Sequence, residues 1–272
     1  MRNRSPEYRI VQLIPQAFPV NFALAFRSMT PVRISLVNLG TLKHAIDIRI
    51  LERLSSGVMT LSHGSSVGHL SNSEGDDWAY TDEQFTRVLK PVAGAHVTLG
   101  LTNCPLEGNY YLRRLPDNVA VLSLHEMADI VRHENFSVET FVRRVAYQLA
   151  VLYKAEGHVP PTGAATWTHD DIRGCLFDMC SSKSDIVFSL NKPSLCGECS
   201  NRVLKKQVDP EFLPQLAGDL KGLHKTLYFR LADWVKGHPI LALVLAALFA
   251  LFVNLLSSVI FEKAKNFWPW IA

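Results

Sequence analysis

The sequence predicts a mixed α/β domain followed by an amphipathic helix and one C-terminal transmembrane helix. Over the first 200 residues, short aliphatic runs bounded by turn residues alternate with segments in which apolar residues recur at helical spacing. The chain has 48% hydrophobic and 19% charged residues, and the shortage of charge is concentrated near the C-terminus. We therefore expect a mixed sheet around a long central helix, attached to a membrane span.

Three segments have the length and composition of buried strands. They are Val32–Leu39, Ala95–Leu101 and Val119–Leu124. Each is short and rich in Val, Leu or Ile, which favours strands inside a sheet. These segments are expected to form the sheet.

Two shorter segments are expected to be helical. Residues from Leu42 to Leu54 carry apolar side chains at helical spacing. Thr81 and Gln84 have the spacing of a capping box, in which the two side chains bond to each other's main-chain N–H groups at the start of a helix. This second helix is expected to end near Lys90.

The longest helix of the domain is predicted between Ser137 and Gly157. Serine is a favourable N-cap, and glycine is the usual residue just after a helix end. Apolar residues recur every three or four positions, at Phe141, Val145, Leu149 and Leu152. A wide apolar face of this kind indicates a helix enclosed in the core.

The C-terminal part changes character after residue 207. Residues 208–236 combine an apolar stripe with charged residues, which predicts an amphipathic helix whose stripe could lie on a bilayer, pack on the domain or pair with a second copy. Residues 237–261 contain no Asp, Glu, Lys or Arg. Such a helix, at about 1.5 Å per residue, spans the roughly 30 Å hydrocarbon layer. We expect a domain over 1–207, these two helices and a short tail over 262–272.

The expected location is a single-pass membrane protein with a C-terminal anchor and a cytoplasmic main domain. The start of the chain lacks the apolar core of a signal peptide, and five cysteines, an odd number, do not favour a disulfide framework. A net charge of +3 and the lack of a basic run interleaved with aromatic residues argue against nucleic acid as a partner.

Four of the five cysteines lie close together in the sequence, as Cys175-x4-Cys180 and Cys196-x2-Cys199. Two such pairs can supply the four thiolates of a closed, tetrahedral site, and thiolates select zinc over magnesium or calcium. The sequence therefore predicts a structural Zn²⁺ site. Cys175 and Cys180 could instead be core residues, in which case His158 or His169 would complete the site.

The order of these features resembles that in the archaemetzincins, a branch of the metzincin metallopeptidases. The resemblance covers residues 95–204 and depends on the strand Leu99–Thr102, the strand Val119–Leu124, the long helix and then the two cysteine pairs. It implies a metzincin-like fold and a zinc knuckle formed by the cysteines.

The catalytic motif of that family is missing. A metzincin helix carries His-Glu-x-x-His, because histidines four residues apart lie on one helix face and hold zinc, while the glutamate takes a proton from the attacking water. The corresponding stretch resembles Tyr147-Gln148-Leu149-Ala150-Val151, which has neither ligand nor base. The resemblance therefore implies a pseudoenzyme.

The alternative is a membrane-bound, metal-dependent hydrolase or peptidase with a rearranged site. Its candidate catalytic residues are His125, Glu126, His133 and His169, with His158 as a further ligand. On a helix, His125 and His133 would stand two turns apart, which is a poor arrangement for chelation.

The function expected from the sequence is that of a membrane-anchored sensing, scaffolding or effector module. A metzincin-like cleft can bind a peptide or protein partner by strand addition without a catalytic metal. In the effector version, the amphipathic helix over 210–236 and the span assemble copies of the chain into a homo-oligomer.

Overall fold

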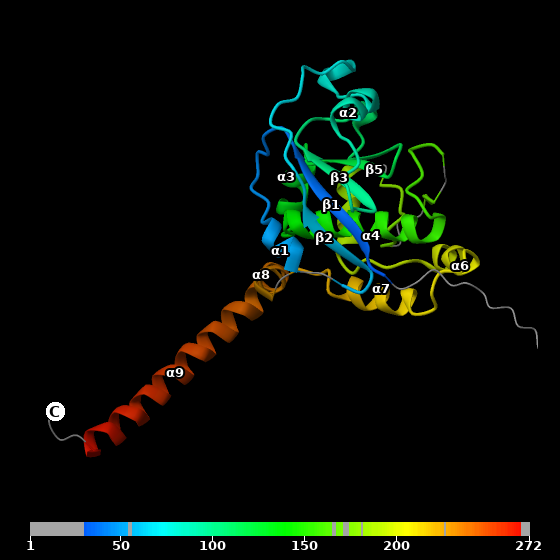
Figure 1. Cartoon of the computed structure of the whole chain (residues 1–272). Helices are drawn as coiled ribbons and strands as arrows, with labels where there is room; N and C mark the ends of the chain where they lie inside the picture. The colour runs from blue at the N-terminus through cyan, green and yellow to red at the C-terminus, as the bar shows by residue number, and fades with distance from the viewer. Residues whose placement is uncertain are drawn as a thin grey trace, which may run out of the picture.

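The computed structural model describes residues 30–53, 56–164, 167–170, 174–180, 182–225 and 227–267. Residues 1–29, on which the expectation of a missing export signal depends, lie outside the described residues. An α/β domain occupies most of the chain, and the last two helices extend from its lower side (Figure 1).

The sheet has five strands in the order β2-β1-β3-β5-β4. Their bounds are β1 (Val32–Leu39), β2 (Met59–His63), β3 (Val97–Thr102), β4 (Leu112–Leu115) and β5 (Val119–Ser123). The strands β2, β1, β3 and β5 run parallel, and the edge strand β4 pairs antiparallel with β5. The three predicted strands are confirmed, whereas β2 and β4 were not predicted. Every residue of β3 and β5 is buried, as expected for strands covered on both faces.

Seven helices of the described chain belong to this domain. They are α1 (Ile48–Arg53), α2 (Asp82–Val88), α3 (Met127–His133), α4 (Val138–Glu156), α5 (Ile186–Leu190), α6 (Gly197–Lys205) and α7 (Phe212–Lys221). The larger core cluster joins one face of the sheet to α4, and a smaller cluster joins the other face to Phe85 and Leu89 near α2. The mixed α/β fold with a long central helix is thus confirmed.

The predicted caps are present in two helices. The Ser137 hydroxyl accepts a hydrogen bond from the Thr140 N–H at 3.1 Å, and Gly157 ends α4 in the left-handed conformation with φ of 78°. Both hydrogen bonds of the capping box between Thr81 and Gln84 open α2. The expected helix from Leu42 is shorter than predicted, since α1 covers only its second half.

The segment expected to form one amphipathic helix over 208–236 forms two helices. These are α7 and α8 (Leu227–Gly237), separated by a turn at Gly222. The apolar face of α7 is buried in the large core cluster through Phe212, Leu216 and Leu220. The turn lets the chain bury this first half of the stripe and carry the second half away from the domain.

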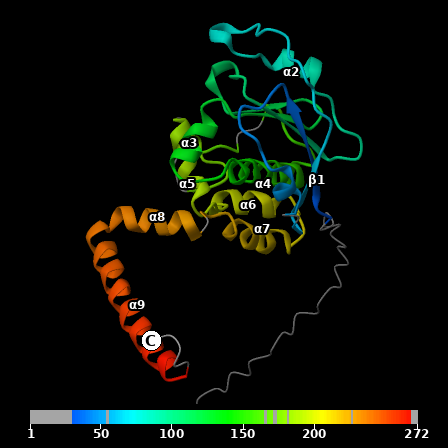
Figure 2. The same ribbon diagram turned by 90° about the vertical axis from the view of Figure 1, so that its left-hand side faces the viewer.

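The last helix, α9 (Pro239–Phe267), is the one described helix that is long and apolar enough to cross a membrane. The candidate span covers Pro239–Lys263, with a mean hydropathy of 2.7, and the domain buries none of it. Figure 2 shows α8 projecting sideways from the lower part of the domain and α9 descending from its far end. The expected span over 237–261 agrees with this helix, and residues 268–272 of the expected tail lie outside the described residues.

The burial of α7 yields a stability prediction. Leu216→Ala removes a side chain that is 1% exposed, and should lower the free energy of unfolding by about 3 kcal/mol, or roughly 6–12 °C in Tm. The same change at Leu231 in α8, which is 61% exposed, should leave the Tm of the domain unchanged. Thermal unfolding of the full chain in a mild detergent measures both, and equal shifts for the two variants would contradict the packing of α7.

Candidate metal centre

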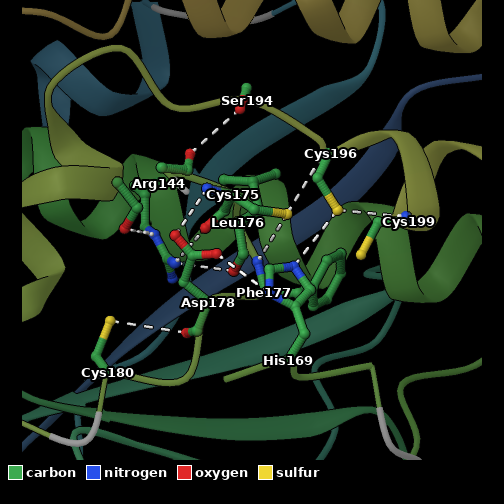
Figure 3. A network of polar contacts seen from close by, with 12 residues as sticks. Arg144, His169, Cys175, Leu176, Phe177, Asp178, Cys180, Ser194, Cys196 and Cys199 are labelled. Carbon is green, nitrogen blue, oxygen red and sulfur yellow. Dashed lines mark hydrogen bonds and ion pairs between the residues drawn. The ribbon is translucent and has the colours of Figure 1, made fainter. Parts of the chain in front are cut away.

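Four side chains that are separated in the sequence by up to thirty residues converge on one point (Figure 3). They belong to His169, Cys175, Cys196 and Cys199, and their ligand atoms all lie within 4.8 Å of one another. Among the described residues this is the one group of three or more His, Cys, Asp or Glu side chains that could hold a metal ion.

The donor set fits zinc. Zn–S bonds of about 2.3 Å in a tetrahedron place two sulfurs about 3.8 Å apart, and a sulfur and an imidazole nitrogen about 3.6 Å apart. The Cys196 Sγ lies 3.4 Å from the His169 Nε2. Three thiolates and one imidazole are soft or borderline ligands, which favour zinc over magnesium or calcium.

The start of α6 positions two of the sulfurs. Cys196 is the N-cap of this helix, and its Sγ accepts a hydrogen bond from the Cys199 N–H at 3.5 Å. The three-residue spacing therefore places both side chains on the same side of the first helical turn. This is the local reason why Cys-x2-Cys forms a knuckle.

Cys175 is the most deeply placed of the three cysteines. Its Sγ accepts hydrogen bonds from the main-chain N–H groups of Cys196 at 3.4 Å and Phe177 at 3.5 Å. A hydrogen bond with the Cys199 thiol, together with these N–H groups, lowers the pKa of Cys175, and the same pairing raises the pKa of Cys199. The site thus favours a thiolate at Cys175, the form in which sulfur binds metals.

A buried carboxylate orients the histidine. The His169 Nδ1 lies 3.4 Å from the Asp178 Oδ1, and the other oxygen of Asp178 accepts a hydrogen bond from the Cys175 N–H at 2.9 Å. A carboxylate at Nδ1 leaves Nε2 directed at the sulfurs, which is the usual support for a metal-binding histidine.

The structure does not place Cys180 with this group. His169 and Asp178 pair as a parallel bridge, in which the Met179 N–H bonds to the His169 carbonyl at 2.9 Å, and Cys180 lies on the other side of Asp178 from the sulfurs (Figure 3). The Cys180 thiol instead donates to the Asp178 carbonyl at 3.7 Å. His169, the alternative named from the sequence, occupies the fourth position. His158 is exposed and lies outside the group.

The proposed hydrolase residues are not brought together. His125, Glu126 and His133 are exposed residues just before and at the end of α3. The Glu126 carboxylate accepts a hydrogen bond from Lys183 Nζ at 2.9 Å, which lowers the pKa of Glu126. None of the three belongs to the candidate metal group.

The stretch from Tyr147 to Val151 in α4 is enclosed in the core. Tyr147 and Val151 are buried, and the Gln148 Oε1 accepts a hydrogen bond from the Arg144 guanidinium at 2.7 Å. Arg144 is fully buried and also donates to the Leu176 carbonyl at 2.8 Å and the Ser189 hydroxyl at 3.1 Å. This network was not predicted from the sequence, where its one signal is an arginine four residues before Gln148 on an otherwise apolar helix face.

A cavity of about 270 Å³ opens beside Gln148. It is lined by Tyr110, Tyr111, Leu112, Arg114, Gln148, Thr162, Gly163, Trp167, Thr168, Phe177, Asp178, Met179 and Cys180. The edge strand β4 forms one wall, and the chain before and after His169 forms the other. The cavity and the metal group are thus separated by the Phe177–Asp178 turn.

Part of the outer edge of β4 is already paired. The N–H of Arg114 donates to the Thr162 hydroxyl, and the Arg114 carbonyl accepts from the Thr162 N–H, both at 2.8 Å. Main-chain groups two residues apart on a strand point to the same edge. Leu112 therefore directs its N–H and carbonyl outward into the cavity region, and neither group bonds to a described residue on that side.

The ligand assignment predicts which substitutions remove a metal. The purified chain should carry one zinc ion. Cys196→Ser and Cys199→Ser should lose this zinc, and His169→Ala should lower the affinity for zinc at least tenfold. Cys180→Ser is the matched control and should retain zinc, because its Sγ is turned away from the group. Elemental analysis after dialysis measures this; zinc lost in Cys180→Ser but kept in His169→Ala would show that the ligand set is wrong.

Comparison with known proteins finds no matching family model and no matching curated protein. Two solved structures are similar. An archaemetzincin from Archaeoglobus fulgidus complexed with malonate is 21% identical, with a TM-score of 0.40 over 62% of this chain and 99% of its own. An archaemetzincin from Methanopyrus kandleri is 17% identical, with a TM-score of 0.43 over 65% of this chain and 96% of its own. Both are archaemetzincins, the family that the strand order and cysteine spacing resemble.

Proposed function

We propose that the chain is a membrane-anchored, non-catalytic metallopeptidase-like domain, in which zinc is structural and the cavity beside β4 binds an extended peptide or partner segment. The observation that carries this proposal is the Arg144–Gln148 hydrogen bond in the middle of α4. Gln148 stands where the family resemblance expects the catalytic base, and its amide cannot take a proton from water.

The zinc in this proposal has a structural role because its site is closed. Catalytic zinc keeps one coordination position open for water or substrate, whereas structural zinc has four protein ligands. His169 and the three cysteines supply four, and Cys175 and Cys199 are buried. The residues present therefore fit an ion that stabilises the fold.

The cavity has the features of a strand-addition site. The outward N–H and carbonyl of Leu112 offer the main-chain hydrogen bonds with which an extended peptide joins an exposed sheet edge. Tyr110 and Trp167 provide apolar wall, and Arg114 provides a positive charge. A short peptide segment with an apolar side chain at its centre fits this chemistry.

The anchor in this proposal is α9, with the α/β domain on the cytoplasmic side. The exposed apolar face of α8 also supports a second arrangement, in which α8 and the span associate with those of another copy. The membrane holds the binding cavity near a surface in both cases, and this limits the partner to proteins that reach the bilayer.

The absence of catalysis can be tested against the hydrolase alternative. Zinc-loaded full chain in detergent should not cleave a degenerate pool of quenched fluorescent peptides above the buffer rate. Gln148→Glu should remain inactive, because the new carboxylate would pair with the buried Arg144 guanidinium. Metal-dependent cleavage by the unmodified chain that disappears in His125→Ala/His133→Ala would overturn the proposal.

The edge of β4 gives a separate test of peptide binding. Leu112→Pro removes the outward N–H without removing a hydrogen bond to β5, and should reduce retention of a degenerate ten-residue peptide pool on the immobilised full chain at least fivefold. Leu112→Ala keeps the N–H and should bind within about twofold of the unmodified chain. Equal retention by both variants, with the Tm unchanged, would exclude strand addition at Leu112.

A further inference from the structure

A second cavity, of about 370 Å³, lies where the domain meets α8. It is lined by Asn191, Lys192, Lys221, His224, Lys225, Arg230 and Asp233. Four of these side chains are cationic and one is anionic. The residues come from the chain after α5, the end of α7, the turn that follows it and α8, so the cavity depends on the turn that joins α7 to α8.

One ion pair fixes the geometry of this cavity. Lys225 Nζ donates to the Asp233 Oδ2 at 2.6 Å, and the Asn135 side chain donates to the Asp233 Oδ1 at 2.9 Å. The hydrogen bond from Lys225 lowers the pKa of Asp233, so the carboxylate stays charged. Lys225 also lies 4.9 Å from the centre of the Phe136 ring. These contacts connect α8 to the chain between α3 and α4.

The pair leaves three positive charges unbalanced. Lys192, Lys221 and Arg230 form no ion pair with any described residue, and all three are exposed at the cavity. Cations that converge on one cavity repel one another and attract a multiply charged anion. Ammonium and guanidinium groups are the usual donors to phosphate oxygens.

The position of α8 indicates the source of that anion. Its exposed apolar residues, at Leu227, Tyr228, Leu231, Trp234 and Val235, lie on one face of the helix. Arg230 lies at the margin of this face, about 10 Å along the axis from the end of α8. The candidate span begins two residues after that end. A helix whose apolar face is exposed next to a span lies at the level of the lipid headgroups.

We infer that this cavity binds the phosphate-bearing headgroup of an anionic membrane lipid, with Lys192, Lys221 and Arg230 as the phosphate ligands. The inference rests on the membrane anchoring in the proposed function. A bound headgroup would fix the orientation of the domain relative to the bilayer. The helix α9 alone attaches the domain at one point (Figure 2), whereas the headgroup adds a second contact and sets which face of the domain lies against the membrane.

The test uses the full chain in uncharged detergent and an acyl-labelled phosphatidylinositol bisphosphate as the probe. Fluorescence anisotropy should show binding that weakens at least tenfold in Lys192→Gln/Lys221→Gln and weakens steeply with salt. Lys90→Gln/Lys205→Gln removes the same charge from exposed positions outside the cavity and should bind within about twofold of the unmodified chain. Equal binding by the two double variants would overturn the assignment.

Two further arms separate the possible failures. Inorganic phosphate and soluble inositol trisphosphate should displace the probe at least tenfold less well than the unlabelled lipid, because neither uses the apolar face of α8; displacement as effective as by the lipid would show a site for free phosphate. Flotation with neutral phosphatidylcholine vesicles tests anchoring alone. The unmodified chain and both double variants should float, and failure to float would refute the membrane anchor rather than the lipid site.

Discussion

The convergence of His169, Cys175, Cys196 and Cys199 holds together the part of the domain with the least regular structure. Between the end of α4 and the start of α6, the longest described helix is the five residues of α5. Leu176 and Phe177 from this region are nevertheless completely buried against α4. A cross-link among residues far apart in the chain lowers the entropy of the unfolded state, and metal binding to such a site contributes directly to folding free energy. The proposed ion would therefore fix the chain that forms one wall of the peptide cavity.

Arg144 connects this region to the central helix. A fully buried guanidinium needs acceptors for its N–H groups, because an unsatisfied buried charge is strongly destabilising. The Leu176 main-chain carbonyl comes from the chain beside Cys175, and the Gln148 side-chain amide oxygen comes from α4 itself. The contacts that attach the irregular segment to α4 thus use Arg144 and Gln148 in the middle of the helix. In the proposed function, the middle of the helix has become a structural joint, and the adjoining cavity is left for binding.

Local signals in the sequence predicted the elements that depend on local physics. Ser137, Gly157 and the pair Thr81 and Gln84 form their caps because capping involves only neighbouring residues. The candidate ligand set required tertiary information: Cys180 has the expected spacing, but the parallel pairing of His169 with Asp178 brings His169 to the sulfurs instead. Similarly, the apolar stripe of residues 208–236 does not reveal that its first half, on α7, is buried in the core and that its second half, on α8, is exposed. The short strands β2 and β4 have little pattern of their own and form because β1 and β5 offer them a partner edge.

X-ray absorption at the zinc K-edge of the purified full chain tests the central claim most directly, because it reports the atoms bound to the metal. The account predicts a single zinc environment with three sulfurs at about 2.3 Å and one nitrogen at about 2.0–2.1 Å. A shell of four sulfurs would restore Cys180 as a ligand and contradict the placement of His169. A second zinc per chain with only nitrogen and oxygen neighbours would contradict the non-catalytic account of α4.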